Sequence, residues 1–162
     1  MLIREATEED WPAIWPFMRG ILAAGETYTY DRDAAEDAVR ASWMLPLPGR
    51  AFVAVDDEGT VLGTSKVSRN HAGGGSHIAN GSYMVDPAHS GRGVGRALGA
   101  HSLEWAAAAG FRAMQFNAVV ETNTHAVALW QSLGFTVVAT LPEGFEHPRH
   151  GFVGLHIMYR KL

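Results

Sequence analysis

The stretch DPAHSGRGVGRALG, from Asp86 to Gly99, decides how this chain is interpreted. It follows an apolar run, SYMV (Ser82 to Val85), that is typical of a strand, and it leads into an alanine-rich pattern that predicts a helix. A glycine-rich turn between a strand and a helix exposes main-chain amides, and the helix dipole favours an anion beside them. The stretch therefore predicts a site for a phosphate-like anion, although a lone loop of this kind can also be no more than a tight connection.

Two common phosphate-binding loops do not fit the residues. A P-loop needs Gly-Lys-Ser/Thr after the glycine turn, whereas Arg96 and Ala97 follow Gly95 here. The dinucleotide fingerprint needs the spacing Gly-x-Gly-x-x-Gly, which Gly91, Gly93 and Gly95 do not provide. Both nucleotide-binding folds are excluded, and the identity of the anion must come from elsewhere in the chain.

Composition limits the class of protein. With 162 residues we expect one domain, residues 1–162, and the net charge of −4 argues against a nucleic-acid partner. No window approaches the roughly 18 apolar residues of a membrane span, and the first residues lack the organisation of a signal peptide. We therefore expect a cytoplasmic protein that binds neither nucleic acid nor membrane. The chain has no cysteine, which excludes disulfides, cysteine-ligated metals and a thiolate nucleophile.

Periodicity along the chain predicts an α/β fold with a mixed sheet. Thr7 followed by acidic residues predicts the start of the first helix, Gly25 its end, and Pro16 a kink or an interruption. The expected strands are 2–6, 51–56, 61–68, 78–86, 112–120, 135–141 and 152–162, and the expected helices are 7–25, 33–45, 94–109 and 122–134, with a glycine-rich loop at 69–77.

Two segments resemble a known family. VDPAHSGRGVGRAL resembles the pyrophosphate-binding motif of the GCN5-related N-acetyltransferases (GNAT), and ETNTHAVALWQSLGF resembles the second signature of that family. One helix and one strand separate the two segments, as the family requires. The resemblance implies the GNAT fold, a mixed and mostly antiparallel seven-stranded sheet with about four flanking helices. It also implies acetyl-CoA as co-substrate without a metal.

A narrower similarity links GETYTY, GGGSHIANGSYMVDP, QFNAVVETN and MYRKL to a subgroup that includes the fungal proline-analogue acetyltransferase and bacterial relatives. From the family resemblance we expect main-chain amides of the glycine loop to bind the pyrophosphate. The pantetheine arm would lie in a V-shaped opening between the strand that ends at Val85 and the strand that begins near Gln115. The expected coenzyme-binding residues are Met84, Val85, Ser90, Gly91, Arg92, Gly93, Val94, Gly95, Arg96, Asn123, Ala126 and Trp130.

Two positions depart from the family pattern. Ser90 stands where Gln or Arg is usual, so we expect weaker anchoring of the coenzyme. Trp130 stands where many members place a tyrosine as general acid, and an indole N–H cannot serve as that acid. The thiolate would leave unassisted, take a proton from water, or take it from Tyr83 or His125. Unassisted departure is chemically reasonable because a thiol has a pKa of about 8.5.

For the acceptor amine, Asn80 and Asn117 stand out as amides within apolar strands. They either pair with each other or with the backbone, or they orient a substrate; the resemblance to the proline-analogue subgroup favours the second role. The expected catalytic set is Asn80, Asn117 and the backbone amide of Val85, and the expected acceptor pocket adds Glu26, Thr27, Tyr28 and Tyr30. Glu26, Glu121, His77 or water remain open as the base.

The predicted activity is acetyl transfer to the amine of a small molecule, an amino acid or an analogue, by direct attack in a ternary complex. No cysteine can carry an acyl intermediate, and no triad supports a seryl one. A protein or peptide N-acetyltransferase and a non-catalytic coenzyme A sensor remain as alternatives. The pair His147 and His150 is compatible with a metal site, but an exposed or dimer-contacting loop is the favoured interpretation. The resemblance and the apolar C-terminal strands also predict a homodimer.

Overall fold

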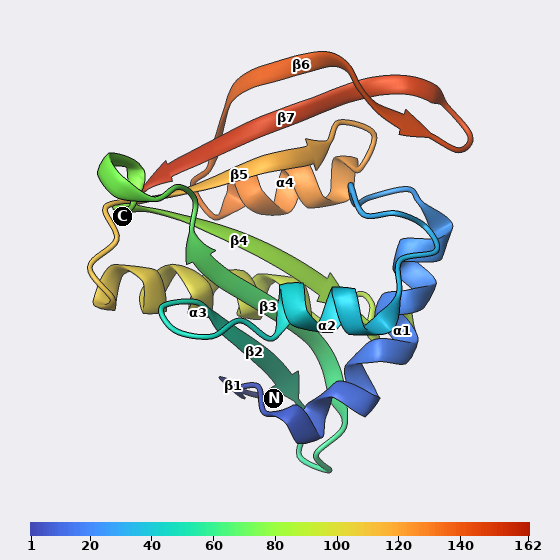
Figure 1. Ribbon diagram of the computed structural model, residues 1–162, viewed down its shortest axis with the longest axis vertical. Helices are drawn as coiled ribbons and strands as arrows, with labels where there is room; N and C mark the ends of the chain where they lie inside the picture. Colours follow the sequence, from blue (N-terminus) through green and yellow to red (C-terminus); the bar gives the residue numbers. More distant parts are fainter.

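The computed structural model describes residues 1–162 and contains one seven-stranded sheet with four α-helices (Figure 1). The strands are β1 (Leu2–Glu5), β2 (Arg50–Val55), β3 (Val61–Arg69), β4 (Ile78–Val85), β5 (Ala113–Val120), β6 (Thr136–His147) and β7 (Gly151–Lys161). The helices are α1 (Trp11–Ala24), α2 (Glu36–Trp43), α3 (Val94–Ala108) and α4 (Thr124–Ser132). The predicted order of strands and helices is confirmed.

The sheet is mixed and mostly antiparallel, as predicted. Its strand order is β1-β2-β3-β4-β5-β7-β6, and β4 with β5 form the single parallel pair. Helices α1 and α2 cover one face and α3 and α4 the other (Figure 1). None of the helices has the length and apolar character needed to span a bilayer.

Strand β2 shows why both faces of the sheet are filled. Val53 packs in the hydrophobic core between the sheet and helices α1 and α2. Phe52, the residue before it, packs in the core on the other face, against α3 and α4. Because successive side chains of a strand point to opposite faces, an apolar run such as RAFVAV serves both layers. Trp43 of α2 is fully buried, and its indole donates to Thr64 Oγ1 over 3.0 Å.

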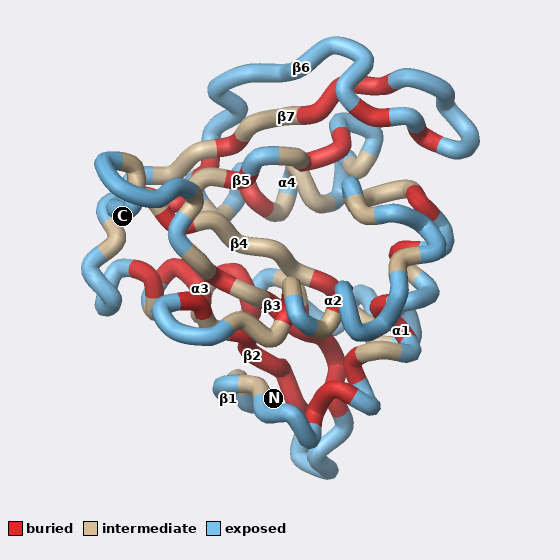
Figure 2. The backbone as a smooth tube through the Cα atoms, viewed as in Figure 1, coloured by how far each residue is buried: buried red, intermediate tan, exposed pale blue.

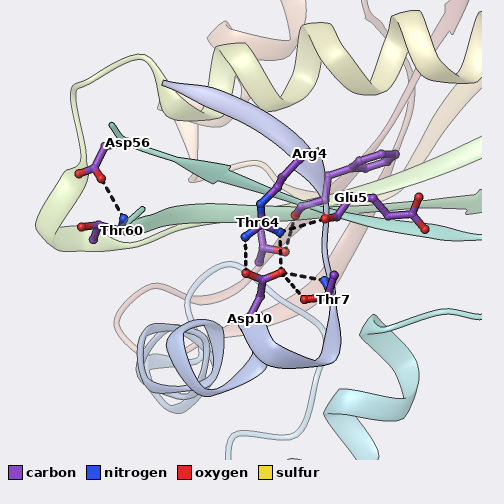
Figure 3. Close-up of polar contacts among 8 residues, drawn as sticks. Arg4, Glu5, Thr7, Asp10, Asp56, Thr60 and Thr64 are labelled. Atoms are coloured by element: carbon purple, nitrogen blue, oxygen red, sulfur yellow. Dashed lines mark hydrogen bonds and ion pairs between the residues drawn. The ribbon is translucent and has the colours of Figure 1, made fainter. Parts of the chain in front are cut away.

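A partly buried ion pair holds the first helix against the sheet (Figure 3). Both guanidinium Nη atoms of Arg4 donate to the Asp10 carboxylate over 2.7 Å, and the Thr7 amide donates to the same carboxylate over 2.7 Å. These contacts hold the pKa of Asp10 below its usual range, chiefly through the hydrogen bond from Arg4. Asp10 thereby joins β1 to the start of α1.

Three details differ from the sequence prediction. Helix α1 continues across Pro16 without the interruption that was one of the two expectations there, and Thr7 precedes a short 3-10 turn (Glu8–Asp10) rather than α1 itself. Helix α2 begins only at Glu36, because the segment before it is taken up by a turn in which the Ala34 amide donates to the Asp31 carbonyl.

Strand β6 continues well past Leu141, where the prediction ended it. Its register against β7 shifts between Leu141 and Phe145, so the segment containing Pro142 bulges out of the ladder. An edge strand tolerates a proline and a bulge because its outer side has no hydrogen-bond partner. Nearly all of β6 is exposed (Figure 2).

Candidate active site

The central feature of the site is a separation between β4 and β5. Their parallel ladder contains only two pairs, Ile78 with Ala113 and Ala79 with Met114. Beyond Ala79 the two strands form no further pair and diverge, whereas β5 stays paired with β7 on its other edge. Two neighbouring hollows occupy the divergence, which is the V-shaped opening expected from the sequence. We call them the loop cleft and the strand cavity.

The loop cleft, of about 540 Å³, lies where the glycine-rich loop meets α3 and α4. The Ser90 amide donates to the Pro87 carbonyl and the Ala97 amide to the Gly93 carbonyl, whereas the amides of residues 91–96 make no main-chain hydrogen bond. Gly91 and Gly93 have φ angles of 76° and 77°, which glycine adopts without steric cost. A run of free amides at a helix N-terminus is a receptor for an anion.

Gly95 has a different function from the other two glycines of the loop. A Cβ atom at this position would lie 3.3 Å from Leu129 Cδ2, so the glycine allows α3 to approach α4 closely. Arg96 strengthens the same contact, because its Nη2 donates to Ser132 Oγ on α4 over 2.8 Å. This leaves the guanidinium beside the cleft, whereas Arg92 turns to His89 Nδ1 at 3.1 Å.

Most of the predicted coenzyme residues line the loop cleft. The structure brings together Ser90, Gly91, Gly93, Val94, Gly95, Arg96, Val85, Asn123, Ala126 and Trp130. Arg92 lies outside the lining of both hollows, and Met84 borders the strand cavity instead. His125, one of the candidate acids, is also part of the cleft lining.

Asn123 serves as the N-cap of α4 while bordering both hollows. Its Oδ1 accepts a hydrogen bond from the Ala126 amide over 3.3 Å. Its Nδ2 group donates to no protein acceptor, so it remains available to a ligand. The cap and the predicted ligand contact are therefore compatible.

The strand cavity, of about 450 Å³, lies between the diverging strands and the segment after α1. Among the predicted acceptor residues it is lined by Thr27, Tyr28, Tyr30, Asn80 and Asn117. Glu26 is not part of the lining; its carboxylate accepts from Arg149 Nη2 over 2.7 Å and ties the segment to the β6–β7 turn. This ion pair, rather than contact with the cavity, is the observed role of Glu26.

Asn70 was missed by sequence reasoning. Asn80 Nδ2 and Asn117 Nδ2 both donate to Asn70 Oδ1, over 3.0 Å and 2.7 Å, and Gln115 Nε2 donates to Asn117 Oδ1 over 2.8 Å. Asn80 and Asn117 therefore meet through a third amide instead of pairing directly. Asn70 follows β3 in a glycine-rich segment, where no periodicity marks it.

Tyr83 borders both hollows, and Tyr28 lines the strand cavity beside it. The Tyr28 hydroxyl donates to the main-chain carbonyl of Tyr83, and burial raises the pKa of both phenols. The Tyr83 hydroxyl donates to Met114 Sδ over 3.5 Å, on the side of the sheet covered by α3. The Tyr83 ring packs 4.7 Å from the Trp130 indole, centroid to centroid, which places both aromatics beneath the opening.

Lys66 is the one charged side chain that forms a hydrogen bond with a residue of the strand-cavity lining. Its Nζ donates to Tyr30 Oη over 3.0 Å and to the Ser42 carbonyl over 2.7 Å, and it lies 5.1 Å from the Trp43 ring centroid. No carboxylate lies within ion-pair distance of this ammonium. The cavity lining itself contains no charged side chain, so Lys66 gives its Tyr30 side a positive potential.

The other candidate bases lie outside both hollows. Glu121 Oε1 accepts from the Gly154 amide over 2.6 Å and fixes β5 to β7, and His77 is exposed in the turn before β4. At the β6–β7 turn, His147 is buried rather than exposed, and its ring lies 4.5 Å from that of His150. The His147 Nδ1 accepts from the Arg149 amide over 3.1 Å, which stabilises the turn.

Comparison with known proteins identifies the family. The model of the acetyltransferase (GNAT) family matches residues 5–135. N-acetyltransferase aca1 of Schizosaccharomyces pombe is 31% identical over 156 residues, which cover 87% of this chain and 75% of that protein. The chain belongs to the GNAT family. The predicted family, fold and enzyme class, an N-acetyltransferase, are confirmed.

Solved GNAT structures agree along the whole chain. A GCN5-related N-acetyltransferase from Kribbella flavida is 55% identical and superposes with a TM-score of 0.97, covering 99% of this chain and 97% of that one. The Salmonella typhimurium protein yncA, solved with its cofactor acetyl-CoA, is 26% identical with a TM-score of 0.83, covering 100% of this chain and 94% of that one. The roles of individual site residues in this GNAT protein stay predictions.

Proposed function

We propose that residues 1–162 form one domain that transfers an acetyl group from acetyl-CoA to the amine of a small molecule, an amino acid or an analogue. The observation that carries this proposal is the meeting of the loop cleft and the strand cavity at the opening between β4 and β5. The two hollows share Tyr83, Val85, Asn123, Ala126 and Trp130. An acyl donor in one and an amine in the other would come into contact there.

In this proposal the free amides of residues 91–96 and the Arg96 guanidinium hold the pyrophosphate of the coenzyme. The similar yncA structure, solved with its cofactor acetyl-CoA, supports binding of that coenzyme. Asn123 Nδ2 donates to the pantetheine arm, which pairs with the open edge of β4 in the manner of an added strand. Ser90 contributes little beyond its backbone, because the loop binds through amides.

The Val85 amide is the proposed donor to the oxyanion. The Tyr83 carbonyl is reached by the Tyr28 hydroxyl from the open side of β4, and main-chain groups two residues apart on a strand face the same edge. The Asp86 amide, one residue further on, donates in the opposite direction to the Leu62 carbonyl over 3.0 Å. The Val85 amide therefore faces the opening and can stabilise a developing negative charge.

The proposed reaction is a direct displacement. The lone pair of the neutral amine attacks the thioester carbonyl carbon, the carbon–sulfur bond breaks, and the coenzyme leaves as its thiolate. The proton released from the amine nitrogen passes to water. The Tyr83 hydroxyl is engaged with Met114 and its pKa is raised, so it does not act as acid; a thiol pKa of about 8.5 permits departure of the anion.

The charges around the strand cavity favour a particular acceptor. Because the lining has no carboxylate and Lys66 contacts Tyr30 behind it, an acceptor that carries a carboxylate is attracted and a second ammonium is repelled. The Asn80 and Asn117 amides orient the acceptor amine and its carboxylate. A small amino acid meets these requirements better than a lysine side chain of a protein.

Release of free thiol from acetyl-CoA, measured with a panel of acceptors, tests the function. The panel contains small amino acids, their uncharged amides, a diamine and a lysine-containing peptide. We expect turnover with amino acids and at least tenfold lower kcat/KM for the diamine. Turnover with the peptide alone would show a protein acetyltransferase, and tight acetyl-CoA binding without turnover of any amine would show a sensor.

The homodimer and the cytoplasmic location are also proposals. The exposed apolar residues of the C-terminal hairpin support the dimer, since Val138 is 56% exposed and Phe152 65% exposed. Both lie beside the unpaired edge formed by β6. Sedimentation at micromolar concentrations tests the assembly, and a monomer throughout that range contradicts it.

A further inference from the structure

Asn70 occupies the point at which the sheet begins to open. Its main-chain amide donates to the Ile78 carbonyl over 2.7 Å, which closes the turn between β3 and β4. The last parallel pair before the opening is Ala79 with Met114, and Asn80 is the next residue on β4. The Asn70 side chain therefore bridges β4 and β5 just where their own ladder stops.

The bridge fixes the orientation of both predicted acceptor amides. One N–H of Asn80 and one N–H of Asn117 are directed to Asn70 Oδ1, over 3.0 Å and 2.7 Å. Asn117 Oδ1 accepts a hydrogen bond from Gln115 Nε2, whereas Asn80 Oδ1 accepts none from the protein. Each amide keeps a second N–H, so these two lining residues retain two N–H donors and one carbonyl oxygen without a protein partner.

A second observation indicates that the Asn70 side chain does more than close the turn between β3 and β4. The main-chain hydrogen bond from Asn70 to Ile78 already joins the turn, and the Asn70 Nδ2 group is buried without a partner. Buried amides normally use both ends of the group. Only the carbonyl end of Asn70 is used here, and both of its hydrogen bonds go to residues that line the strand cavity.

We infer that Asn70 is a positioning residue of the acceptor site, which holds Asn80 and Asn117 in the orientation that binds the acceptor. This inference rests on the proposed function of the strand cavity. Asn70 itself does not line either hollow, so it acts through the other two amides. Such a residue is expected to change acceptor binding while leaving the coenzyme site unaffected, because its hydrogen-bond partners do not line the loop cleft.

The test compares Asn70→Leu, which removes the shared acceptor, with Asn70→Asp, which keeps an oxygen at that position. For Asn70→Leu we expect kcat/KM for the acceptor to fall about tenfold to a hundredfold, with the KM for acetyl-CoA unchanged. Asn70→Asp is expected to recover most of that loss. His71→Ala is the matched control, because His71 is the exposed next residue and makes no side-chain hydrogen bond; it should behave like the wild type.

A mutant cycle separates orientation from a general structural defect. If Asn70 acts through Asn80 and Asn117, Asn70→Leu in an Asn80→Ala/Asn117→Ala background should lower kcat/KM by less than about threefold. A full additional loss in that background, or an equal rise of both KM values together with a lower melting temperature, overturns the inference. Wild-type kinetics of Asn70→Leu also overturn it.

Side-chain amide NMR provides a readout that does not depend on turnover. In ¹H–¹⁵N spectra, Asn70→Leu should shift the Nδ2 resonances of Asn80 and Asn117, and Asn70→Asp should keep them dispersed. Unmoved resonances overturn the orientation whatever the kinetics show. If the wild type acetylates no amine but the resonances move as expected, the orientation by Asn70 stands and the proposed function fails.

Discussion

The loop cleft and the strand cavity are built in different ways. The loop cleft presents main-chain amides from one continuous stretch, residues 91–96, at the start of α3. The strand cavity presents side chains from the segment after α1, from β4 and from β5, oriented by an amide that follows β3. A backbone receptor tolerates changes of side chain, whereas a side-chain receptor depends on each of its members. The coenzyme side should therefore be sensitive to conformation and the acceptor side to chemistry.

The largest expected effect is on the backbone receptor. Gly93 caps α3 with a φ of 77°, a conformation that a β-branched residue adopts only with strain. Gly93→Val should raise the Kd for acetyl-CoA about a hundredfold in calorimetry, because the loop amides no longer converge. Gly20→Ala, in the middle of α1 with no heavy atom near its missing Cβ, is the control and should keep the wild-type Kd. An unchanged Kd in Gly93→Val contradicts the loop's role.

A side-chain change in the strand cavity should impair use of the acceptor and leave acetyl-CoA binding unchanged. Asn117→Ala removes an amide that lines the strand cavity and is held by Asn70 and Gln115. We expect kcat/KM for the acceptor to fall about tenfold to a hundredfold while the Kd for acetyl-CoA stays within twofold. Initial-rate kinetics with both substrates varied would show this split. A rise in the Kd for acetyl-CoA alone would mean that the two sides are not separate.

The charge behind Tyr30 sharpens the comparison further. Lys66→Met keeps the length and apolar contacts of the side chain but removes the ammonium next to Tyr30 and Ser42. The KM for an amino-acid acceptor should rise about fivefold to tenfold, whereas the KM for its uncharged amide should hardly change. Equal effects on both acceptors would indicate a packing defect rather than a lost charge.

Substitution of the Arg4–Asp10 ion pair tests whether the segment after α1, which lines the strand cavity with Tyr28 and Tyr30, depends on the anchoring of α1. Arg4 holds the pKa of Asp10 below its usual range, so this pair stabilises the fold above about pH 4 and ceases to do so as the pH falls through the lowered pKa. Asp10→Asn should lower the free energy of unfolding by about 1–2 kcal/mol at pH 7, a modest value because Arg4 is partly exposed. The loss should be smaller in acid, where Asp10 is protonated in the wild type.

Melting curves between pH 7 and pH 2 measure this difference. Glu9→Gln, an exposed neighbour outside any ion pair, is the control. We also expect the KM for the acceptor to rise severalfold in Asp10→Asn at neutral pH, because α1 leads into Tyr28 and Tyr30. If the stability difference between Asp10→Asn and the wild type grew as the pH fell, the ion pair would not be its cause.

The same contrast explains what could be predicted from the sequence. The loop cleft is lined largely by one continuous stretch of backbone, so one motif predicted most of its lining. Arg92 belongs to that motif but lies outside the lining, because its side chain turns to His89. The strand cavity is assembled from distant segments. Asn80 and Asn117 were noticed as polar residues in apolar strands, but Asn70 carries no such mark.

Long-range pairing accounts for the other discrepancies. Glu26 was assigned to the pocket because it belongs to the segment after α1, but its partner is Arg149, 123 residues later in the chain. The extension of β6 past Pro142 likewise depends on β7, which supplies the ladder that the local sequence does not suggest. The layers of the fold were predictable because burial on both faces of a strand leaves a local apolar pattern.

The smallest expected effect concerns the thiolate. Tyr83 borders both hollows, which makes its phenol the most obvious substitute for a tyrosine at position 130, yet its hydroxyl points to Met114 Sδ and burial raises its pKa. Tyr83→Phe should therefore keep kcat within about threefold of the wild type across pH 6 to 9, since a phenylalanine preserves the ring contact with Trp130. A loss of a hundredfold or more with an unchanged KM for both substrates would make Tyr83 the acid, because proton transfer from a positioned side chain is worth about that much. Retained activity instead removes Tyr83 from the candidate acids and leaves departure of the coenzyme as the anion, or its protonation by water or His125. Catalysis then depends on the Val85 amide and on the orientation of the two substrates.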